Sequence, residues 1–143
     1  MKRIFIAFVI CFTTSIFLTQ AQETGNEVFI KAEKDAQFPG GLEAWAKFLG
    51  ENIDRETAVN NGAPAGSYTV IIKFIVTKDG SVTGIVAETK LGYKMETAVM
   101  KAISLSPKWK PAIQNGKPVN AYRRQPITFV VEERKAKRGK RKN

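Results

Sequence analysis

The chain has 143 residues, which is enough for one domain with flanking segments. Its formal net charge is +10, it contains no histidine, and its only cysteine is Cys11. These counts exclude histidine-based catalytic triads, an intrachain disulfide, and metal sites built from histidine and cysteine side chains.

Residues 1–21 have the composition of a secretory signal peptide. Lys2 and Arg3 precede an apolar run from Ile4 to Leu18, and small and polar residues follow up to Ala21. Because spanning a bilayer takes roughly 20 apolar residues, this run is short for a membrane anchor. We therefore expect export and cleavage after Ala21, with an uncleaved inner-membrane anchor as the alternative.

Residues 22–37 are polar and predict a lead-in, with at most a short strand at residues 28–30. Phe38-Pro39-Gly40-Gly41 then predicts a turn that opens a helix. The apolar residues of this helix recur at helical spacing and are expected to be buried: Leu42, Trp45, Phe48 and Leu49. The composition of residues 60–66 predicts a loop.

Two apolar runs joined by Lys78-Asp79-Gly80 predict a β-hairpin. In the first run, residues 68–76, alternate side chains share one face, with Val70, Ile72, Phe74 and Val76 on the apolar side. The return run covers residues 81–90, and Gly84 within it predicts a β-bulge.

A second helix is predicted after Leu91-Gly92 and before Pro107. Its apolar stripe consists of Met95, Ala98, Val99, Ala102 and Ile103. Asn115-Gly116 predicts a turn, and residues 119–132 predict the last strand. This order of elements predicts an α+β fold over residues 38–133, with two helices packed on one face of a small antiparallel β-sheet of three main strands.

The last strand contains the candidate binding site. Its apolar part begins after Pro126, and proline donates no N–H to a ladder, so this strand is expected at a sheet edge. The residues of the candidate edge are Arg124, Gln125, Pro126, Ile127, Thr128, Phe129, Val130 and Val131. We expect Ile127, Phe129 and Val131 to point into the core, whereas the outer backbone groups can pair with another strand.

Two alternatives accompany this site. The edge is expected to be open to a partner. The alternative is an edge that binds nothing, because it is blunted by proline and charge or covered by the chain's own tail. Arg123 and Arg124 form a candidate charge clamp for an acidic residue beside a bound peptide, with a solvated pair as the alternative.

Most of the net charge lies in the C-terminal segment, residues 134–143. Seven cations fall between Arg134 and Lys142, whereas residues 22–133 carry 14 basic and 13 acidic side chains. Such a segment is expected to be a disordered basic tail. Anionic envelope polymers and lipid head groups are its candidate targets, and a solvating tail without a partner is the alternative. No aromatic residue accompanies the charge, so nucleic acid is not expected.

Catalytic signals are weak. The sequence has no glycine-rich phosphate loop, and carboxylate pairs such as Asp54 and Glu56 lie in polar surroundings. We therefore expect no enzyme activity, no cofactor and no metal.

An ordered set of motifs resembles the C-terminal domain of TonB proteins. The set consists of Phe38-Pro39-Gly40-Gly41, Val76 to Val82, Ala98, Trp109-Lys110-Pro111-Ala112, Gln114 to Val119, and Gln125 to Phe129. The resemblance implies a periplasmic domain that binds the TonB-box peptide of outer-membrane transporters as an added strand and supports energy-coupled transport. Pairing of two copies through strand edges is an alternative use of the same edge.

Two features depart from the family pattern. Residues 22–37 are the only spacer and reach at most roughly 55 Å when extended, whereas energy-transducing members have a long proline-rich spacer. The Tyr-Pro stretch with Gly-X-X-Gly that usually precedes the hairpin is replaced by residues 60–67. The alternative is a stand-alone binding or scaffold module, tethered to an anionic envelope surface by its basic tail, without energy transduction.

Overall fold

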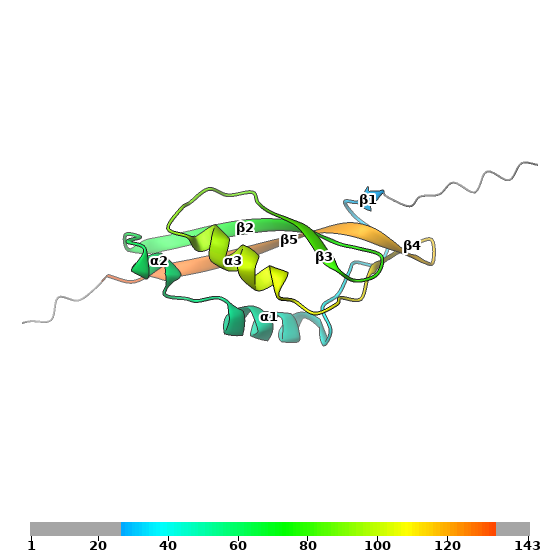
Figure 1. Ribbon diagram of the computed structural model, residues 1–143, viewed down its shortest axis with the longest axis horizontal. Coiled ribbons are helices and arrows are strands. Elements are labelled where there is room, and N and C mark those ends of the chain that lie inside the picture. The colour runs from blue at the N-terminus through cyan, green and yellow to red at the C-terminus, as the bar shows by residue number, and fades with distance from the viewer. Residues whose placement is uncertain (1–26, 134–143) are drawn as a thin grey trace, which may run out of the picture.

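The computed structural model describes residues 27–133 (Figure 1). The expected signal peptide, residues 1–21, and the basic tail, residues 134–143, lie outside the described residues. The elements are β1 (Val28–Phe29), α1 (Gly41–Asn52), α2 (Thr57–Asn60), β2 (Gly66–Val76), β3 (Val82–Ala87), α3 (Met95–Ser104), β4 (Ala112–Gln114) and β5 (Lys117–Val131).

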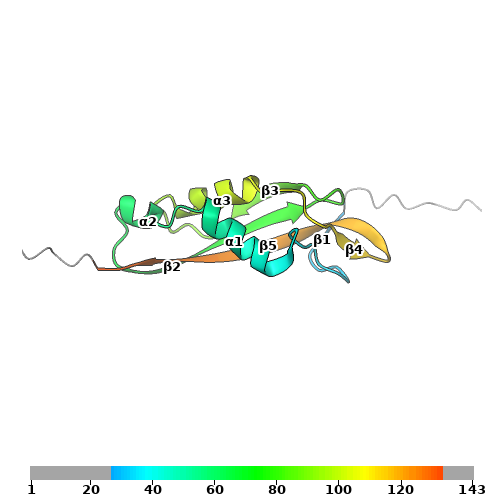
Figure 2. The same cartoon turned by 90° about the horizontal axis from the view of Figure 1, so that it is seen from below.

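The sheet has the strand order β1-β5-β2-β3, and β4 also pairs with β5. β2 is antiparallel to both β3 and β5, whereas β1 is parallel to β5. The helices lie on one side of this sheet (Figure 2). The predicted α+β class is therefore confirmed, and the three main strands are β2, β3 and β5. The sequence patterns missed α2 and β4, each of which has only three or four residues.

The last strand begins two residues earlier than predicted. β5 begins at Lys117, because Asn115 and Gly116 form the turn of a hairpin in which Gln114 lies opposite Lys117. Pro126 therefore lies inside a continuous strand, opposite Ile71, and does not open it.

Part of the predicted lead-in belongs to the folded domain. The Lys34 N–H donates to the Ile113 carbonyl oxygen at 3.1 Å, and the Gln37 N–H donates to the Lys110 carbonyl oxygen at 2.9 Å. Within this segment Ala32 and Ala36 are buried. The domain thus starts before Phe38, because these residues extend the structure around β4 and β5.

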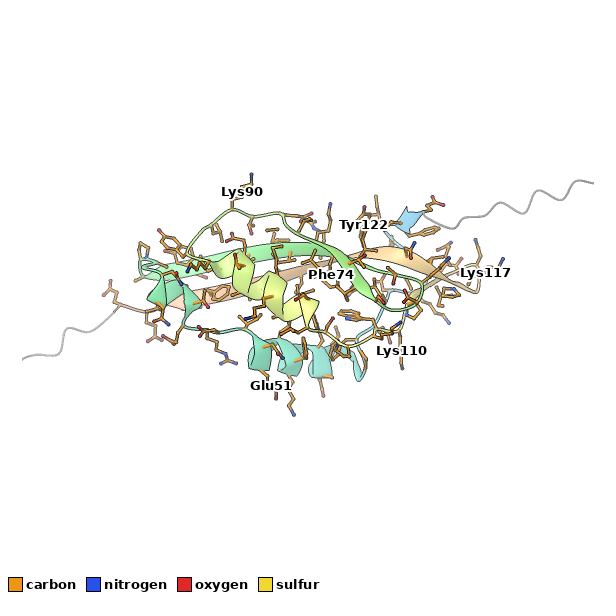
Figure 3. The ribbon with its side chains drawn as sticks, in the orientation of Figure 1. Glu51, Phe74, Lys90, Lys110, Lys117 and Tyr122 are labelled. Atoms are coloured by element: carbon orange, nitrogen blue, oxygen red, sulfur yellow. The ribbon has the colours of Figure 1, made fainter. Side chains whose placement is uncertain are left out.

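The core lies between the sheet and the helices. Phe74 is 1% exposed and lies at the centre of the molecule, whereas Lys90, Lys110 and Lys117 extend into solvent (Figure 3). The alternation predicted for β2 is confirmed, since Val70, Ile72, Phe74 and Val76 are all buried. The α3 stripe is also confirmed, with Ala98 only half-buried at its margin.

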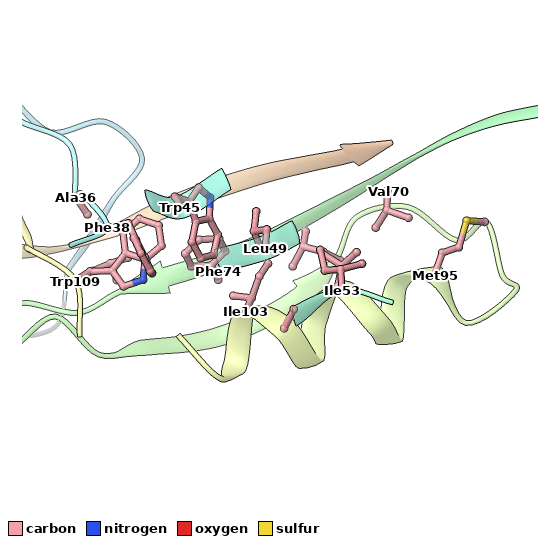
Figure 4. Packing of buried hydrophobic residues seen from close by; sticks show 14 of the residues in the cluster. Ala36, Phe38, Trp45, Leu49, Ile53, Val70, Phe74, Met95, Ile103 and Trp109 are labelled. Carbon is pink, nitrogen blue, oxygen red and sulfur yellow. The ribbon is translucent and has the colours of Figure 1, made fainter. Parts of the chain in front are cut away.

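An aromatic cluster joins α1 to the rest of the core (Figure 4). The ring centroids of Trp45 and Trp109 are 4.9 Å apart, and those of Phe74 and Trp109 are 5.6 Å apart. Phe38 also packs on both tryptophans. Tilted and edge-on contacts of this kind are favourable between aromatic rings and add to the burial of their area.

The hairpin turn docks against the segment that follows α3. The Trp109 N–H donates to the Gly80 carbonyl oxygen at 2.8 Å. Gly80 has φ +86°, and a Cβ at this position would overlap the Trp109 carbonyl oxygen. Further along β3, the register shifts between Lys73 and Ile75 of β2, which confirms the bulge predicted at Gly84.

Asp79 organises the same turn. Its carboxylate accepts hydrogen bonds from the Thr77 hydroxyl, from Lys108 Nζ at 3.0 Å and from Ser81 Oγ at 2.9 Å. The hydrogen bond from Thr77, followed by those from Lys108 and Ser81, holds the pKa of Asp79 well below its ordinary value near 3.8.

This depressed pKa predicts how the turn contributes to stability. A carboxyl with a lower pKa in the folded than in the unfolded state stabilises the fold above the unfolded pKa, and this contribution fades as the pH falls. We expect Asp79→Asn to destabilise the domain at pH 6 and to matter progressively less below about pH 4. Urea unfolding of both proteins at pH 6 and pH 3 measures this, and an equal difference at the two pH values would contradict it.

Candidate functional site

The orientation of β5 shows which of its backbone groups face away from β2. Ile71 lies opposite Pro126. The Ile71 carbonyl oxygen accepts from the Glu88 N–H at 2.8 Å, and the Ile71 N–H donates to Thr89 Oγ1 at 3.1 Å. Both groups therefore face the β3 side, and Ile71 exchanges no ladder bonds with Pro126. Since this direction alternates along a strand, the backbone groups of Pro126 point away from β2.

The same alternation shows which way the backbone groups of the neighbouring β5 residues point. Arg124, Thr128 and Val130 have the same orientation as Pro126, so their N–H and C=O groups also point outward. Pro126 has no N–H, and its carbonyl oxygen accepts from Gln125 Nε2 at 2.9 Å. The β2–β5 ladder therefore loses no hydrogen-bond donor at Pro126, whereas the outer edge has one N–H donor fewer.

The outer edge is covered only at its beginning. β1 pairs with Asn120 and Ala121, and within residues 27–133 no strand pairs with the outer side of β5 beyond them. The predicted edge position is therefore confirmed for the C-terminal half of β5.

A groove runs along this open edge. α1 lies beside the outer edge of β5 (Figure 1). The cavity between them has a volume of about 650 Å³. It is lined by Leu42, Trp45, Ala46, Leu49, Gly50, Ile53, Arg55, Gln125, Ile127, Thr128, Phe129 and Val130. The groove thus combines outward backbone groups on one wall with a mainly apolar helix on the other.

One hydrogen bond positions the helix against the edge strand. Trp45 Nε1 donates to Gln125 Oε1 at 2.7 Å, while the Trp45 ring is 5% exposed. This contact holds the N-terminal half of α1 beside Gln125, so the groove has a defined wall.

Leu42 corrects the prediction for the first helix. It was expected in the core with Trp45 and Leu49, but its side chain is 79% exposed and lines the groove. Helical spacing places Leu42 on the same side of α1 as Trp45 and Leu49. In the structure, however, it borders the groove between α1 and β5 and stays exposed. Ala46, Gly50, Ile53 and Arg55 were likewise missed as site residues.

The predicted edge residues lie where alternation places them. Phe129 and Val131 are buried and Ile127 is half-buried against the core, whereas Val130 is 70% exposed. The Thr128 hydroxyl lies on the opposite face, 3.0 Å from the Thr69 hydroxyl. Apart from Val130, these side chains contact the rest of the domain, so the groups that this edge leaves open are mainly those of the backbone.

The two arginines of the candidate clamp already have partners. Arg124 Nε donates to Glu88 Oε2 at 2.7 Å, and Arg123 Nη1 lies 3.5 Å from Asp35 Oδ2. A peptide carboxylate would have to compete with these intramolecular pairs, so the clamp stays a prediction.

Residues 27–133 contain no group of three or more acidic, histidine or cysteine side chains placed to hold a metal ion. None of the described helices is both long and apolar enough to cross a membrane.

Comparison with known proteins agrees with this geometry. Residues 67–131 match the family described as the Gram-negative bacterial TonB protein C-terminal, a match that runs from β2 through β5. No curated protein and no solved structure matches the chain. The matched segment includes the whole open edge but not α1, the other wall of the groove. Through residues 67–131 the chain thus matches the TonB C-terminal domain family, as its motifs predicted.

Proposed function

We propose that this domain binds an extended peptide as an added strand on the outer edge of β5. The observation that carries the proposal is the unpaired edge from Arg124 to Val131 beside the apolar groove. The proposed ligands are TonB-box-type N-terminal peptides of outer-membrane transporters, the partners that family membership favours. The module binds and does not catalyse.

The outer edge has the groups that strand addition needs. Arg124, Thr128 and Val130 each offer an outward N–H, and these residues together with Pro126 offer outward carbonyl oxygens. Alternate side chains of an added strand would point toward α1, where Leu42 and Ala46 provide exposed apolar surface. Ordering a flexible peptide costs several kcal/mol, so we expect modest affinity.

A proline at position 130 tests the strand-addition proposal. The Val130 N–H points outward, so Val130→Pro removes a donor from the open edge and none from the β2–β5 ladder. We expect Val130→Pro to weaken the binding of a transporter N-terminal peptide about tenfold or more, because a backbone hydrogen bond is lost and the edge is distorted. Val130→Ala is the matched control and should change affinity less than threefold, since this side chain is 70% exposed.

Titration of the labelled protein followed by NMR measures both affinities, and circular dichroism checks that each variant is folded. The largest amide shifts should fall on residues 124–131 and on α1. Equal binding by the proline and alanine variants, or shifts centred elsewhere, would contradict the proposal.

We further propose that the domain acts in the periplasm and supports energy-coupled transport. The signal-type sequence of residues 1–21 and the family membership of residues 67–131 support this location. If the role is correct, cells carrying Val130→Pro should lose uptake through the transporter whose peptide binds in vitro, whereas Val130→Ala cells should not. Normal uptake in both strains would leave a stand-alone binding module, tethered to an anionic surface, as the better description.

A further inference from the structure

The groove beside β5 contains one charged side chain. Among its lining residues only Arg55 is ionised at neutral pH, and the others are apolar or uncharged. Arg55 is solvent-exposed, so an anion docked in the groove can reach it, and the attraction between them is the modest one of a surface ion pair.

Arg55 has no acidic partner within the described residues. The ion pairs there join Lys47 to Glu51, Lys108 to Asp79, Arg123 to Asp35 and Arg124 to Glu88. Asp54 and Glu56 flank Arg55 in sequence, yet neither carboxylate lies within 4.0 Å of its guanidinium nitrogens. Unlike Arg123 and Arg124, Arg55 can therefore bind a ligand carboxylate without breaking an existing ion pair.

The chain direction places Arg55 at one end of the groove. Trp45, in the first half of α1, bonds to Gln125, so the helix starts beside the middle of β5. Val59, just after Arg55, lines a cavity with Val131 at the end of β5. α1 thus runs in the same direction as β5, and Arg55 lies toward the Thr128–Val130 end of the open edge.

We propose that Arg55 selects peptides that carry an aspartate or glutamate at the end of the docked strand beside Val130. This inference rests on the proposed strand addition at β5. The guanidinium can donate two parallel hydrogen bonds to one carboxylate, which a neutral side chain at that position cannot accept equally well.

Three synthetic heptapeptides test the proposal, each acetylated and amidated with alternating valine and threonine between its ends. One has glutamine at both ends, one has glutamate at the first position, and one has glutamate at the last. We expect the wild-type domain to bind one glutamate peptide about fivefold more tightly than the glutamine peptide at low salt. The preferred end also reports the direction of the docked strand, and the preference should fall as salt is added.

Arg55→Gln and Lys47→Gln make a matched pair of variants. Both remove one positive charge, but Lys47 is exposed and pairs with Glu51, whose side chain extends from α1 away from the sheet (Figure 3). Arg55→Gln should abolish the preference for the glutamate peptide, and Lys47→Gln should retain it.

The outcomes separate this inference from the strand-addition proposal. If the wild-type domain binds all three peptides equally, or if Arg55→Gln keeps the preference, Arg55 does not select the ligand, although strand addition stands. If none of the peptides binds at millimolar concentration, both proposals are overturned.

Discussion

Replacing Gly80 with alanine should destabilise the domain by about 3 kcal/mol. Gly80 has φ +86°, which costs an L-residue about 1–2 kcal/mol on its own. The added Cβ would also overlap the Trp109 carbonyl oxygen and disturb the hydrogen bond from the Trp109 N–H to Gly80. Urea unfolding, followed by tryptophan fluorescence, measures the loss.

Gly92 provides a control with the same backbone conformation. Its φ is also +86°, but no atom lies within 4 Å of the position that a Cβ would occupy. Gly92→Ala should therefore cost only the backbone term, about 1–2 kcal/mol. Equal losses at positions 80 and 92 would show that contact between the turn and Trp109 contributes nothing to stability.

The second large effect is expected at Phe74. This side chain is 1% exposed and lies between Trp45 and Trp109, with ring centroids 6.5 Å and 5.6 Å away. Phe74→Ala should destabilise the domain by about 4 kcal/mol, because it loses buried area and leaves a cavity. The free energy of unfolding of a protein domain is only about 5–15 kcal/mol, so this variant should unfold at a much lower urea concentration than the wild type.

Ile75→Ala is the control for this substitution. Ile75 is the next residue of β2, and its half-buried side chain lies on the opposite face of the sheet. We expect a loss of about 1 kcal/mol there. Phe74→Leu, which keeps most of the apolar volume, should fall between the two. A loss at Phe74 no larger than that at Ile75 would contradict the assignment of the aromatic cluster as the centre of the core.

The local elements could be predicted because their signals lie within short stretches of sequence. Alternation in residues 70–76 predicted the buried face of β2, and the spacing of Met95, Val99 and Ile103 predicted that of α3. The bulge at Gly84 was predicted for the same reason, since an interior glycine often interrupts a strand. In each case a few neighbouring residues decide the local conformation.

The boundaries of β5 were harder to predict from sequence. The apolar part of the last strand was expected to begin after Pro126, yet this proline lies inside a paired strand that starts at Lys117. The tolerance of this proline depends on which way its backbone nitrogen faces, and that follows from pairing with Ile71, far away in the sequence. Local patterns contain no information about this register.

The sequence by itself therefore determined the two longer helices, the three main strands, the fold class and the edge character of the last strand. Only the tertiary structure decided that α1 forms the second wall of the site, that Leu42 lines it, and that Arg55 is its single cation. It also decided that Arg123 and Arg124 pair with Asp35 and Glu88. These features depend on distances between elements separated by many residues, and such distances are set by the packing of the whole core and not by any local pattern.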